Sequence, residues 1–342
     1  MKALLYTGAY QLELREMEKP APREDEVCIR VKAVAICGSD LSGYRGENSL
    51  RAAPLVMGHE FSGQIVECGA GVRTLQPGMR VVVNPSLFCG ECENCRNGRS
   101  NLCDKKTVPG TSVGGVNTPG AMAEYICVRA SSVIGIPDDV SYEDAALLEP
   151  FAVSLHGVKR GGDLRGKKTA VIGCGPIGLF ALQCIRSAEA AQSIAMDIVP
   201  GRLLTARACG ATDTLDLLNE PLERVWTLTH GSGADVVFDC VGNERSLRQA
   251  SEIVRNGGLI VVIGMAAQEI HFPIKRFVAH EFTLTGSYQY LDEIREGILL
   301  LHSRKIDFSE IITSVIPLSE GKSAFDALTS KNPKDVKIVL RP

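Results

Sequence analysis

The sequence predicts an α/β protein in which a doubly wound parallel sheet is combined with a second, mostly β region. Three observations support this prediction. Short apolar strands punctuated by glycine and proline fill the first 140 residues, strands alternate with helices from residue 169 to 287, and a glycine-rich turn opens that second region. A chain of 342 residues is long enough to bury two hydrophobic cores.

Composition and charge exclude several classes of function. The net charge of −3 carries no long single-sign block, so nucleic acid and anionic lipid are not expected partners, and we expect a small-molecule substrate. No apolar run approaches about 18 residues, so we expect neither a signal peptide nor a membrane span. Twelve cysteines in such a chain favour the reducing cytoplasm, where clustered cysteines are metal ligands first.

The first region contains few helices and several clear strands. The clearest are residues 26–36 (EVCIRVKAVAI), 63–69 (GQIVECG) and 80–85 (RVVVNP). The pattern changes at Ser141, where SYEDAALLEP combines a Ser-x-x-Asp capping pattern with an apolar run. We therefore expect a helix to begin there.

The second region repeats a strand and then a helix. The expected strands are 169–173 (TAVIG), 193–197 (SIAMD), 213–217 (DTLDL), 234–240 (ADVVFDC), 259–264 (LIVVIG) and 282–287 (FTLTGS). Amphipathic stretches such as 200–210 and 244–257 are the expected helices between them, and this alternation is typical of a parallel sheet. The tail adds a helix at 291–304 and a strand at 335–340.

A phosphate-binding turn is predicted where the first of these strands ends. Gly173, Gly175 and Gly178 have the G-x-G-x-x-G spacing between an apolar strand and an apolar helix. Asp197 ends the next strand about 20 residues later, at the position that accepts hydrogen bonds from an adenosine ribose. Because a carboxylate repels a 2′-phosphate, the sequence favours NAD over NADP.

Four cysteines in fifteen residues predict a structural metal site. Cys89, Cys92, Cys95 and Cys103 have the C-x2-C-x2-C-x7-C spacing, and their loop has almost no apolar residues to pack. Four thiolates make a closed zinc site, whose binding energy replaces the missing core. An iron–sulfur cluster is the alternative. The single cysteines 28, 68, 127, 184, 209 and 240 are each expected to be small core residues.

A second candidate set is scattered along the chain: Cys37 in ICGSD, His59 and Glu60 in MGHEFSG, and Glu149 in LLEP. Each residue alone has an ordinary structural interpretation, and spacing arguments cannot bring them together. The stretch 58–72, GHEFSGQIVECGAGV, resembles the zinc signature of the medium-chain alcohol dehydrogenases, and the cysteine loop and glycine turn follow in that family's order. The resemblance covers nearly the whole chain.

This resemblance implies a GroES-like catalytic domain at residues 1–152 and 289–342, interrupted by a Rossmann NAD-binding domain at 153–288. It also implies a catalytic zinc bound by Cys37 and His59, with Glu60 and Glu149 sharing the remaining places in an order that sequence does not rank. Ser39 matches the hydroxyl that relays the substrate proton. The implied cofactor contacts besides the glycines are Ile177, Asp197, Arg202, Gly264, Met265 and Tyr288.

Glu149 resembles the polyol and threonine dehydrogenase branch, so the expected reaction is NAD-dependent oxidation of a secondary hydroxyl of a polyol, sugar or sugar derivative. The alternatives are a threonine-type or simple alcohol dehydrogenase and a non-catalytic NAD-binding or zinc-ribbon interaction protein. Gln289 and Tyr290 are candidate substrate contacts. Because sorbitol-type enzymes carry an arginine at the position of Gln289, their substrate contacts cannot be copied. Family members are usually dimers or tetramers, and we expect one of these.

Overall fold

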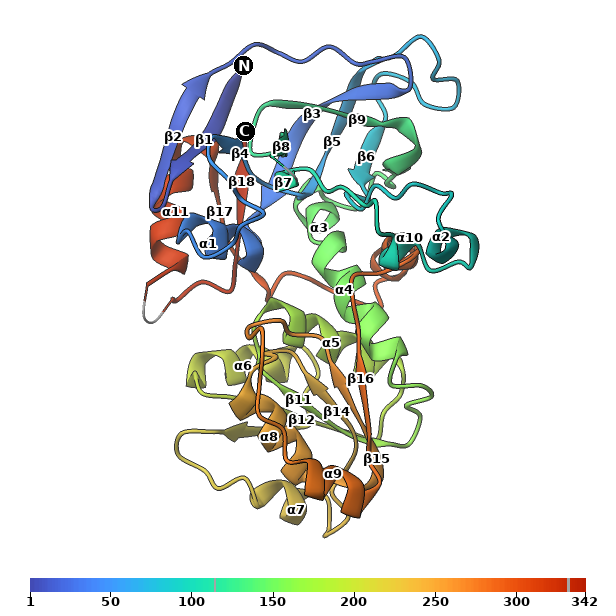
Figure 1. Cartoon of the computed structure of the whole chain (residues 1–342), viewed down its shortest axis with the longest axis vertical. Coiled ribbons are helices and arrows are strands. Elements are labelled where there is room, and N and C mark those ends of the chain that lie inside the picture. The colour runs from blue at the N-terminus through green and yellow to red at the C-terminus, as the bar shows by residue number, and fades with distance from the viewer. Residues whose placement is uncertain (114, 331–332) are drawn as a thin grey trace. The chain divides into compact units, whose positions relative to one another are not determined.

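The computed structural model describes residues 1–113, 115–330 and 333–342 (Figure 1). The chain forms two compact units. Unit 1 comprises Met1–Glu149, Ile294–Ser303 and Ile312–Pro342, and unit 2 comprises Pro150–Glu293 and Arg304–Ile311. Within the described residues, every helix is too short or too polar to cross a bilayer.

Unit 1 is mostly β, as the sequence predicts. Its largest sheet has the order β10-β6-β5-β3-β18-β17, with β9 also paired to β3, and smaller sheets are formed by β2-β1-β4 and by β7-β8. The strands are β1 (Lys2–Gly8), β2 (Gln11–Glu16), β3 (Glu26–Ala35), β4 (Leu55–Val56), β5 (Glu60–Cys68), β6 (Arg80–Val83), β7 (Thr111–Val113), β8 (Val116–Thr118), β9 (Tyr125–Arg129), β10 (Val133–Gly135), β17 (Ile312–Pro317) and β18 (Lys337–Arg341).

Short helices connect these strands. They are α1 (Gly38–Tyr44), α2 (Glu93–Arg96), α3 (Tyr142–Ala146) and α11 (Gly321–Leu328), with 3₁₀ turns at Ser100–Leu102, Ala130–Ser132 and Leu318–Glu320. The helix expected at Ser141 is confirmed, because Ser141 Oγ accepts a hydrogen bond from the Asp144 backbone N–H at 3.0 Å. The chain passes between the units four times: in α4 (Leu148–Lys159), at the start of α10 (Glu293–His302), after Ser303 and before Ile312.

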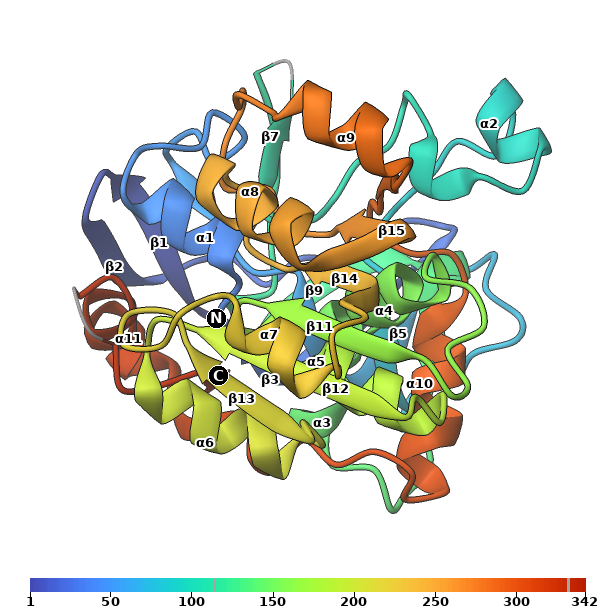
Figure 2. The same cartoon turned by 90° about the horizontal axis from the view of Figure 1, so that it is seen from below.

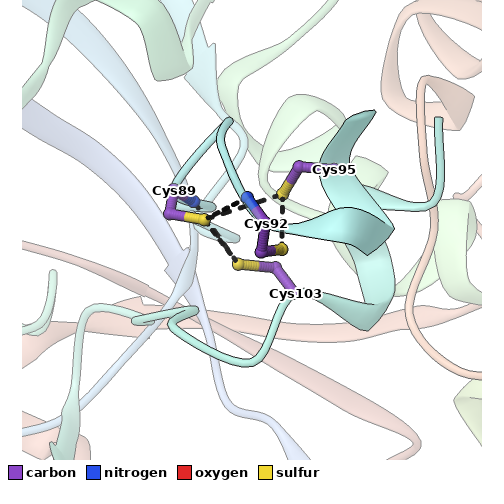
Figure 3. A group of neighbouring side chains, drawn as sticks. All are labelled: Cys89, Cys92, Cys95 and Cys103. Atoms are coloured by element: carbon purple, nitrogen blue, oxygen red, sulfur yellow. Dashed lines mark hydrogen bonds between the residues drawn. The ribbon is translucent and has the colours of Figure 1, made fainter. Parts of the chain in front are cut away.

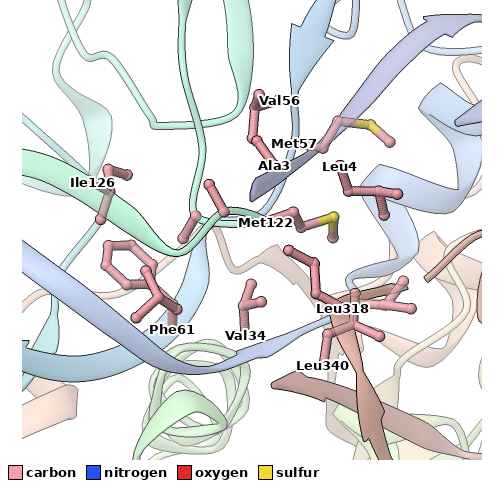
Figure 4. Close-up of a cluster of buried hydrophobic side chains, with 14 of the residues drawn as sticks. Ala3, Leu4, Val34, Val56, Met57, Phe61, Met122, Ile126, Leu318 and Leu340 are labelled. Carbon is pink, nitrogen blue, oxygen red and sulfur yellow. The ribbon is translucent and has the colours of Figure 1, made fainter. Parts of the chain in front are cut away.

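The core of unit 1 is a cluster of buried apolar side chains from its strands and from the segments that connect them (Figure 4). Val34, Phe61 and Leu340 come from β3, β5 and β18 and are fully buried in one cluster. The prediction that the single cysteines are core residues is wrong for three of the six, because Cys68, Cys127 and Cys240 are only half-buried. Cys68 ends its strand and Cys240 follows one, whereas Cys127 points away from the face of its core neighbours Ile126 and Val128.

Unit 2 contains the predicted parallel sheet, in the order β13-β12-β11-β14-β15-β16. Its strands are β11 (Lys168–Ile172), β12 (Gln192–Asp197), β13 (Asp213–Asp216), β14 (Ala234–Asp239), β15 (Val254–Val262) and β16 (Thr283–Gly286). Chain order reverses between β11 and β14, and ligands of doubly wound sheets bind at the carboxyl ends of strands at such a reversal. The predicted fold class is confirmed.

The helices of unit 2 cover both faces of this sheet. They are α5 (Pro176–Ser187), α6 (Pro200–Ala208), α7 (Arg224–Leu228), α8 (Glu244–Ile253) and α9 (Ile274–His280). Figure 2 shows α8 and α9 on one side of the strands and α6 on the other. The expected helical stretch 244–257 is too long. The helix ends at Ile253, and Gly257 follows with a left-handed φ of +64°, which a helix cannot accommodate.

Candidate active site and metal centres

The four-cysteine loop brings its sulfurs around one point (Figure 3). Cys89 Sγ lies 3.5 Å from Cys103 Sγ and 4.0 Å from Cys95 Sγ, and Cys92 Sγ lies 3.4 Å from Cys95 Sγ. Four sulfurs bonded to one tetrahedral zinc ion at about 2.3 Å lie about 3.8 Å apart. The loop therefore fits a single ion, whereas a cluster of several irons would hold its thiolates farther apart.

Backbone N–H groups of the same loop point at the sulfurs. The Cys92 N–H donates to Cys89 Sγ and the Cys89 N–H donates to Cys103 Sγ, both at 3.4 Å. Hydrogen bonds from the backbone of Glu91 and Cys92 lower the pKa of Cys89 to about 6. Because these donors favour the charged sulfur, the loop is prepared for the thiolate form that a metal requires.

A second group of possible metal ligands lies in unit 1. Atoms of Cys37, His59 and Glu60 lie within 4.8 Å of one another. Cys37 is the N-cap of α1, and His59 directly precedes β5. The Nδ1 atom of His59 is buried without a hydrogen-bond partner among the described residues and lies 3.8 Å from Asp40 Oδ1. A sulfur, an imidazole and a carboxylate together suit zinc.

Gly58 shows why the chain approaches this group so closely. Its φ is +98°, and a Cβ atom there would lie 2.8 Å from Met122 Cγ. Only glycine combines that backbone conformation with the close approach. The glycine of the GHE stretch therefore positions the histidine that follows it.

Charges inside unit 1 act on His59. Burial lowers the pKa of this imidazole, but the charges of Cys37 and Asp40 outweigh burial and raise it to about 10. The charge of Glu149 contributes in the same direction, although Glu149 lies outside the compact group of three ligands. Glu149 is 7% exposed at the start of α4. The negative groups around His59 therefore favour a positive charge at this position.

Lys337 is a site residue that the sequence reasoning missed. Its Nζ atom lies 2.6 Å from Glu60 Oε2 and donates to the Ile36 carbonyl at 2.9 Å, and its side chain is 3% exposed. Burial lowers the pKa of Lys337, but the charges of Glu60 and Cys37 raise it overall. The available signal was a single lysine within the apolar strand 335–340, although its partner could not be read from the sequence.

Ser39 lies beside Cys37 and is held by a buried arginine. Its hydroxyl donates to Cys37 Sγ at 3.3 Å and accepts from Arg51 Nη2 at 3.0 Å. Arg51 Nε donates to Asp40 Oδ1 at 3.1 Å, and Asp40 is fully buried. Asp40 Oδ1 in turn lies 3.8 Å from His59 Nδ1. Arg51 and Asp40 were also missed by sequence reasoning.

The predicted phosphate-binding turn is present in unit 2. Gly173 has a φ of +90°, and a Cβ atom at Gly178 would lie 1.8 Å from the Gly173 carbonyl oxygen. A Cβ atom at Gly175 would meet nothing within 4 Å, so the space above the start of α5 is open. A pyrophosphate fits such an opening at a helix N-terminus.

A cavity of about 360 Å³ adjoins this turn. Of the predicted cofactor residues, it is lined by Gly173, Gly175, Asp197 and Arg202. Asp197 Oδ2 accepts from the Cys174 N–H at 2.6 Å and Oδ1 from the Val199 N–H at 2.8 Å. The sequence reasoning did not identify the lining residues of the other strand–helix connection: Asn243, Arg245, Ser246 and Gln249.

The other predicted contacts also belong to unit 2. Ile177 lies in α5, and its carbonyl accepts from Ser154 Oγ at 3.0 Å. Gly264 packs tightly, since a Cβ atom there would lie 2.2 Å from the Val241 carbonyl carbon. The remaining side chains differ in exposure: Met265 is 75% exposed, Tyr288 is 41% exposed and Tyr290 is 2% exposed. The backbone of Gln289 has a left-handed φ of +51°.

Two family models match the chain. Residues 23–138 match the alcohol dehydrogenase GroES-like domain, and residues 176–303 match the zinc-binding dehydrogenase model. The chain is 34% identical over 348 residues to a sorbitol dehydrogenase of Bacillus subtilis (strain 168), covering 100% of this chain and 97% of that protein. It is also 34% identical to an L-threonine 3-dehydrogenase of the same strain over 338 residues, covering 96% of each.

Solved structures show the same architecture. Galactitol-1-phosphate dehydrogenase from Escherichia coli matches with a TM-score of 0.92 and 27% identity, covering 100% of both chains. A zinc-binding dehydrogenase from Sinorhizobium meliloti 1021 bound to NADP matches with a TM-score of 0.92 and 29% identity, covering 100% of this chain and 99% of that chain.

Proposed function

The chain belongs to the zinc-dependent medium-chain alcohol dehydrogenase family, and we propose that it transfers hydride between NAD and a secondary hydroxyl of a polyol, sugar or sugar derivative. The observation that carries this proposal is the group of Cys37, His59 and Glu60 with the Ser39 hydroxyl beside it. The related sorbitol and galactitol-1-phosphate dehydrogenases support the substrate class.

The candidate metal-site residues of unit 1 each have a proposed role. Cys37, His59 and Glu60 would hold the catalytic zinc, with Glu149 as the nearby second carboxylate, and the four-cysteine loop would hold a structural zinc. A bound zinc supplies a Lewis acid, which lowers the pKa of bound water from 15.7 to about 7 and acts on a bound alcohol in the same sense. Lys337 fixes Glu60 by their 2.6 Å ion pair.

Ser39 would move the proton. Its Oγ would accept the proton of the substrate hydroxyl and pass its own proton to solvent water, because Ser39 is only half-buried. With NAD bound, the nicotinamide would supply the hydride acceptor. Arg51 donates to the same oxygen and fixes its direction. Ile177, Gly264, Met265 and Tyr288 stay proposed cofactor contacts, and Gln289 and Tyr290 stay proposed substrate contacts.

Threonine oxidation is the second candidate, because a threonine dehydrogenase is as similar in sequence as a sorbitol dehydrogenase. The two activities differ in what the substrate presents to the enzyme. An amino acid carries a carboxylate and an ammonium group, whereas a polyol carries a row of hydroxyl groups. Buried polar groups left unpaired cost about 1 to 3 kcal/mol each, so the correct class is expected to be preferred by tens to hundreds of fold.

Steady-state kinetics on zinc-loaded protein tests the proposal. The panel contains hexitols, pentitols, inositols, their phosphates, L-threonine, benzyl alcohol and ethanol, each with NAD and with NADP. We expect the highest kcat/KM with a polyol or its phosphate, and Ser39→Ala with wild-type zinc content should lose most of the turnover. If L-threonine or ethanol gives the highest value, the polyol assignment is wrong.

We further propose that unit 1 is the catalytic zinc domain and unit 2 the NAD-binding domain. A cytoplasmic location and a homodimeric or homotetrameric assembly complete the proposal. Reduced cysteines in both metal-ligand sets support the cytoplasm. Size-exclusion chromatography with light scattering tests the assembly, because a monomeric mass would contradict it.

A further inference from the structure

Two cysteines outside both metal-ligand sets face each other across neighbouring strands. Cys28 lies in β3 and Cys127 in β9, and the antiparallel register places them directly opposite each other. Opposite residues of an antiparallel pair have Cα atoms about 4.5 to 5.5 Å apart, and disulfides span Cα separations of about 4.4 to 6.8 Å. The backbone therefore already meets the distance requirement of a disulfide.

The two thiols also interact with each other. Directly opposite side chains project from the same face of a sheet, and a hydrogen bond with Cys127 lowers the pKa of Cys28 while raising that of Cys127. Cys28 Sγ additionally donates to the Pro20 carbonyl at 3.8 Å, and the positive charge of Lys19 acts on it. Negative charge is therefore favoured on Cys28, the thiol whose pKa is lowered.

The two cysteines differ in access to solvent. Cys28 is 0% exposed, whereas Cys127 is half-buried. A small oxidant can thus reach Cys127 and meet Cys28 only through it. This arrangement resembles an attacking thiol with a resolving thiol behind it.

We propose that Cys28 and Cys127 form a reversible dithiol–disulfide site that a low-molecular-weight disulfide oxidises. Cys127 Sγ attacks one sulfur of the small disulfide and gives its proton to the Cys28 thiolate, while the S–S bond breaks and releases one small thiolate, which takes that proton from Cys28. The Cys28 thiolate then attacks Cys127 Sγ, and the second small thiolate leaves with its electron pair. Two protein thiols are oxidised, one small disulfide is reduced to two thiols, and the two protein protons go to them.

Closing this disulfide ties β3 to β9 across a loop of about 100 residues. Such a loop loses much of its freedom in the unfolded chain, so the oxidised protein is expected to unfold at a higher temperature. Neither cysteine belongs to the proposed catalytic residues, so turnover is expected to persist. This inference does not rest on the proposed function.

The test uses full-length, zinc-loaded protein incubated with oxidised glutathione at pH 8, alkylated and digested with trypsin without reduction. Cys28 is the only cysteine of tryptic peptide 24–30, and Cys127 is the only cysteine of peptide 107–129. We expect the two peptides to be joined by a disulfide, with a mass two hydrogens below their sum, and dithiothreitol to separate them. The protein should lose two titratable thiols per chain, and its zinc content should not change. The melting temperature should rise by several degrees.

Three variants make the assignment specific. Cys28→Ala should stop at one glutathione on Cys127, Cys127→Ala should take up none at Cys28, and Cys184→Ala, which removes a buried cysteine of unit 2, should behave as wild type. Recovery of both peptides alkylated and unlinked overturns the proposal. The proposal is also overturned if the oxidant first reacts with the cysteines of the zinc loop and releases zinc while peptides 24–30 and 107–129 stay unlinked.

Discussion

Arg51 donates a hydrogen bond to Ser39 Oγ at 3.0 Å from a side chain that is only 4% exposed. The same guanidinium binds Asp40, so a buried cation connects the proposed proton-relay hydroxyl to a buried carboxylate. Gly43 makes this possible, because a Cβ atom there would lie 2.4 Å from Arg51 Cγ. Any larger residue at position 43 would therefore clash with the Arg51 side chain.

The first prediction is that Arg51 positions Ser39 for turnover. Arg51→Lys keeps a positive charge near Asp40 but cannot reproduce the forked pair of hydrogen bonds. A hydrogen bond to a charged group contributes about 1.5 to 3 kcal/mol, so kcat should fall roughly 10- to 100-fold while the KM for NAD and the zinc content stay unchanged. Kinetics and metal analysis on the same preparation check this.

A double-mutant cycle separates positioning from general destabilisation. If Arg51 acts through Ser39, Arg51→Lys should have little further effect on kcat in a Ser39→Ala background. Arg51→Met is the harsher variant, because it leaves Asp40 buried and unpaired, at a cost of about 3 to 5 kcal/mol in stability. Additive losses of kcat in the cycle would contradict the positioning role.

The second prediction is two zinc ions per chain with different roles. Cys95→Ser should reduce zinc to one per chain and lower the melting temperature by several degrees, because metal binding replaces a hydrophobic core in that loop. Cys37→Ser should abolish turnover and leave circular dichroism and the loop zinc intact. A single zinc ion in fully loaded wild-type protein would exclude two sites.

Local patterns explain which parts of this molecule could be predicted. Cys89, Cys92, Cys95 and Cys103 lie within fifteen residues, so their spacing alone limits the geometry, and the glycine turn with Asp197 is read across a single strand–helix–strand unit. The strands of unit 2 are also regular because a parallel sheet buried on both faces needs apolar runs. The sequence therefore predicted the cysteine loop, the glycine turn and the strands of unit 2.

Long-range contacts explain the rest. Lys337 reaches Ile36 across 301 residues, and Cys28 meets Cys127 only because β3 pairs with β9. Glu60 adjoins His59 in the sequence, but only the fold brings the two beside Cys37, so Glu60 and Glu149 could not be ranked from sequence. Spacing contains no information on which strands become neighbours, so these relationships require coordinates.

The third prediction concerns the cofactor. Asp197 lines the cavity of unit 2, and a 2′-phosphate there would face its carboxylate, although Arg202 Nη1 lies 4.0 Å from Asp197 Oδ2. We expect kcat/KM with NAD to exceed that with NADP by at least about 10-fold, and Asp197→Asn to reduce that ratio. Because a solved relative binds NADP, equal values for both cofactors in the wild type would reassign the preference.

The fourth prediction is a stability contribution that disappears in acid. Glu293 accepts hydrogen bonds from the Leu291 N–H at 2.6 Å and pairs with His156 Nδ1 at 3.1 Å and Lys159 Nζ at 3.4 Å. Burial raises the pKa of this carboxyl, but the bonds to His156 and Leu291 and the charge of Lys159 outweigh burial and lower it to about 2.

Since an unfolded glutamate titrates near 4.5, the unfolded chain takes up this proton first as the pH falls. The contribution of Glu293 is therefore complete above about pH 4.5 and is lost as the pH falls towards 2. At pH 7, Glu293→Gln should lower the free energy of unfolding by about 1 to 3 kcal/mol and lower the melting temperature with it. At pH 3 the variant should differ less from wild type.

Thermal melts between pH 7 and pH 3 check this trend. Glu269→Gln is the control, because Glu269 is an exposed carboxylate of the same unit. A difference between Glu293→Gln and wild type that stays constant from pH 7 to pH 3 would show that the charge of Glu293 does not stabilise the fold.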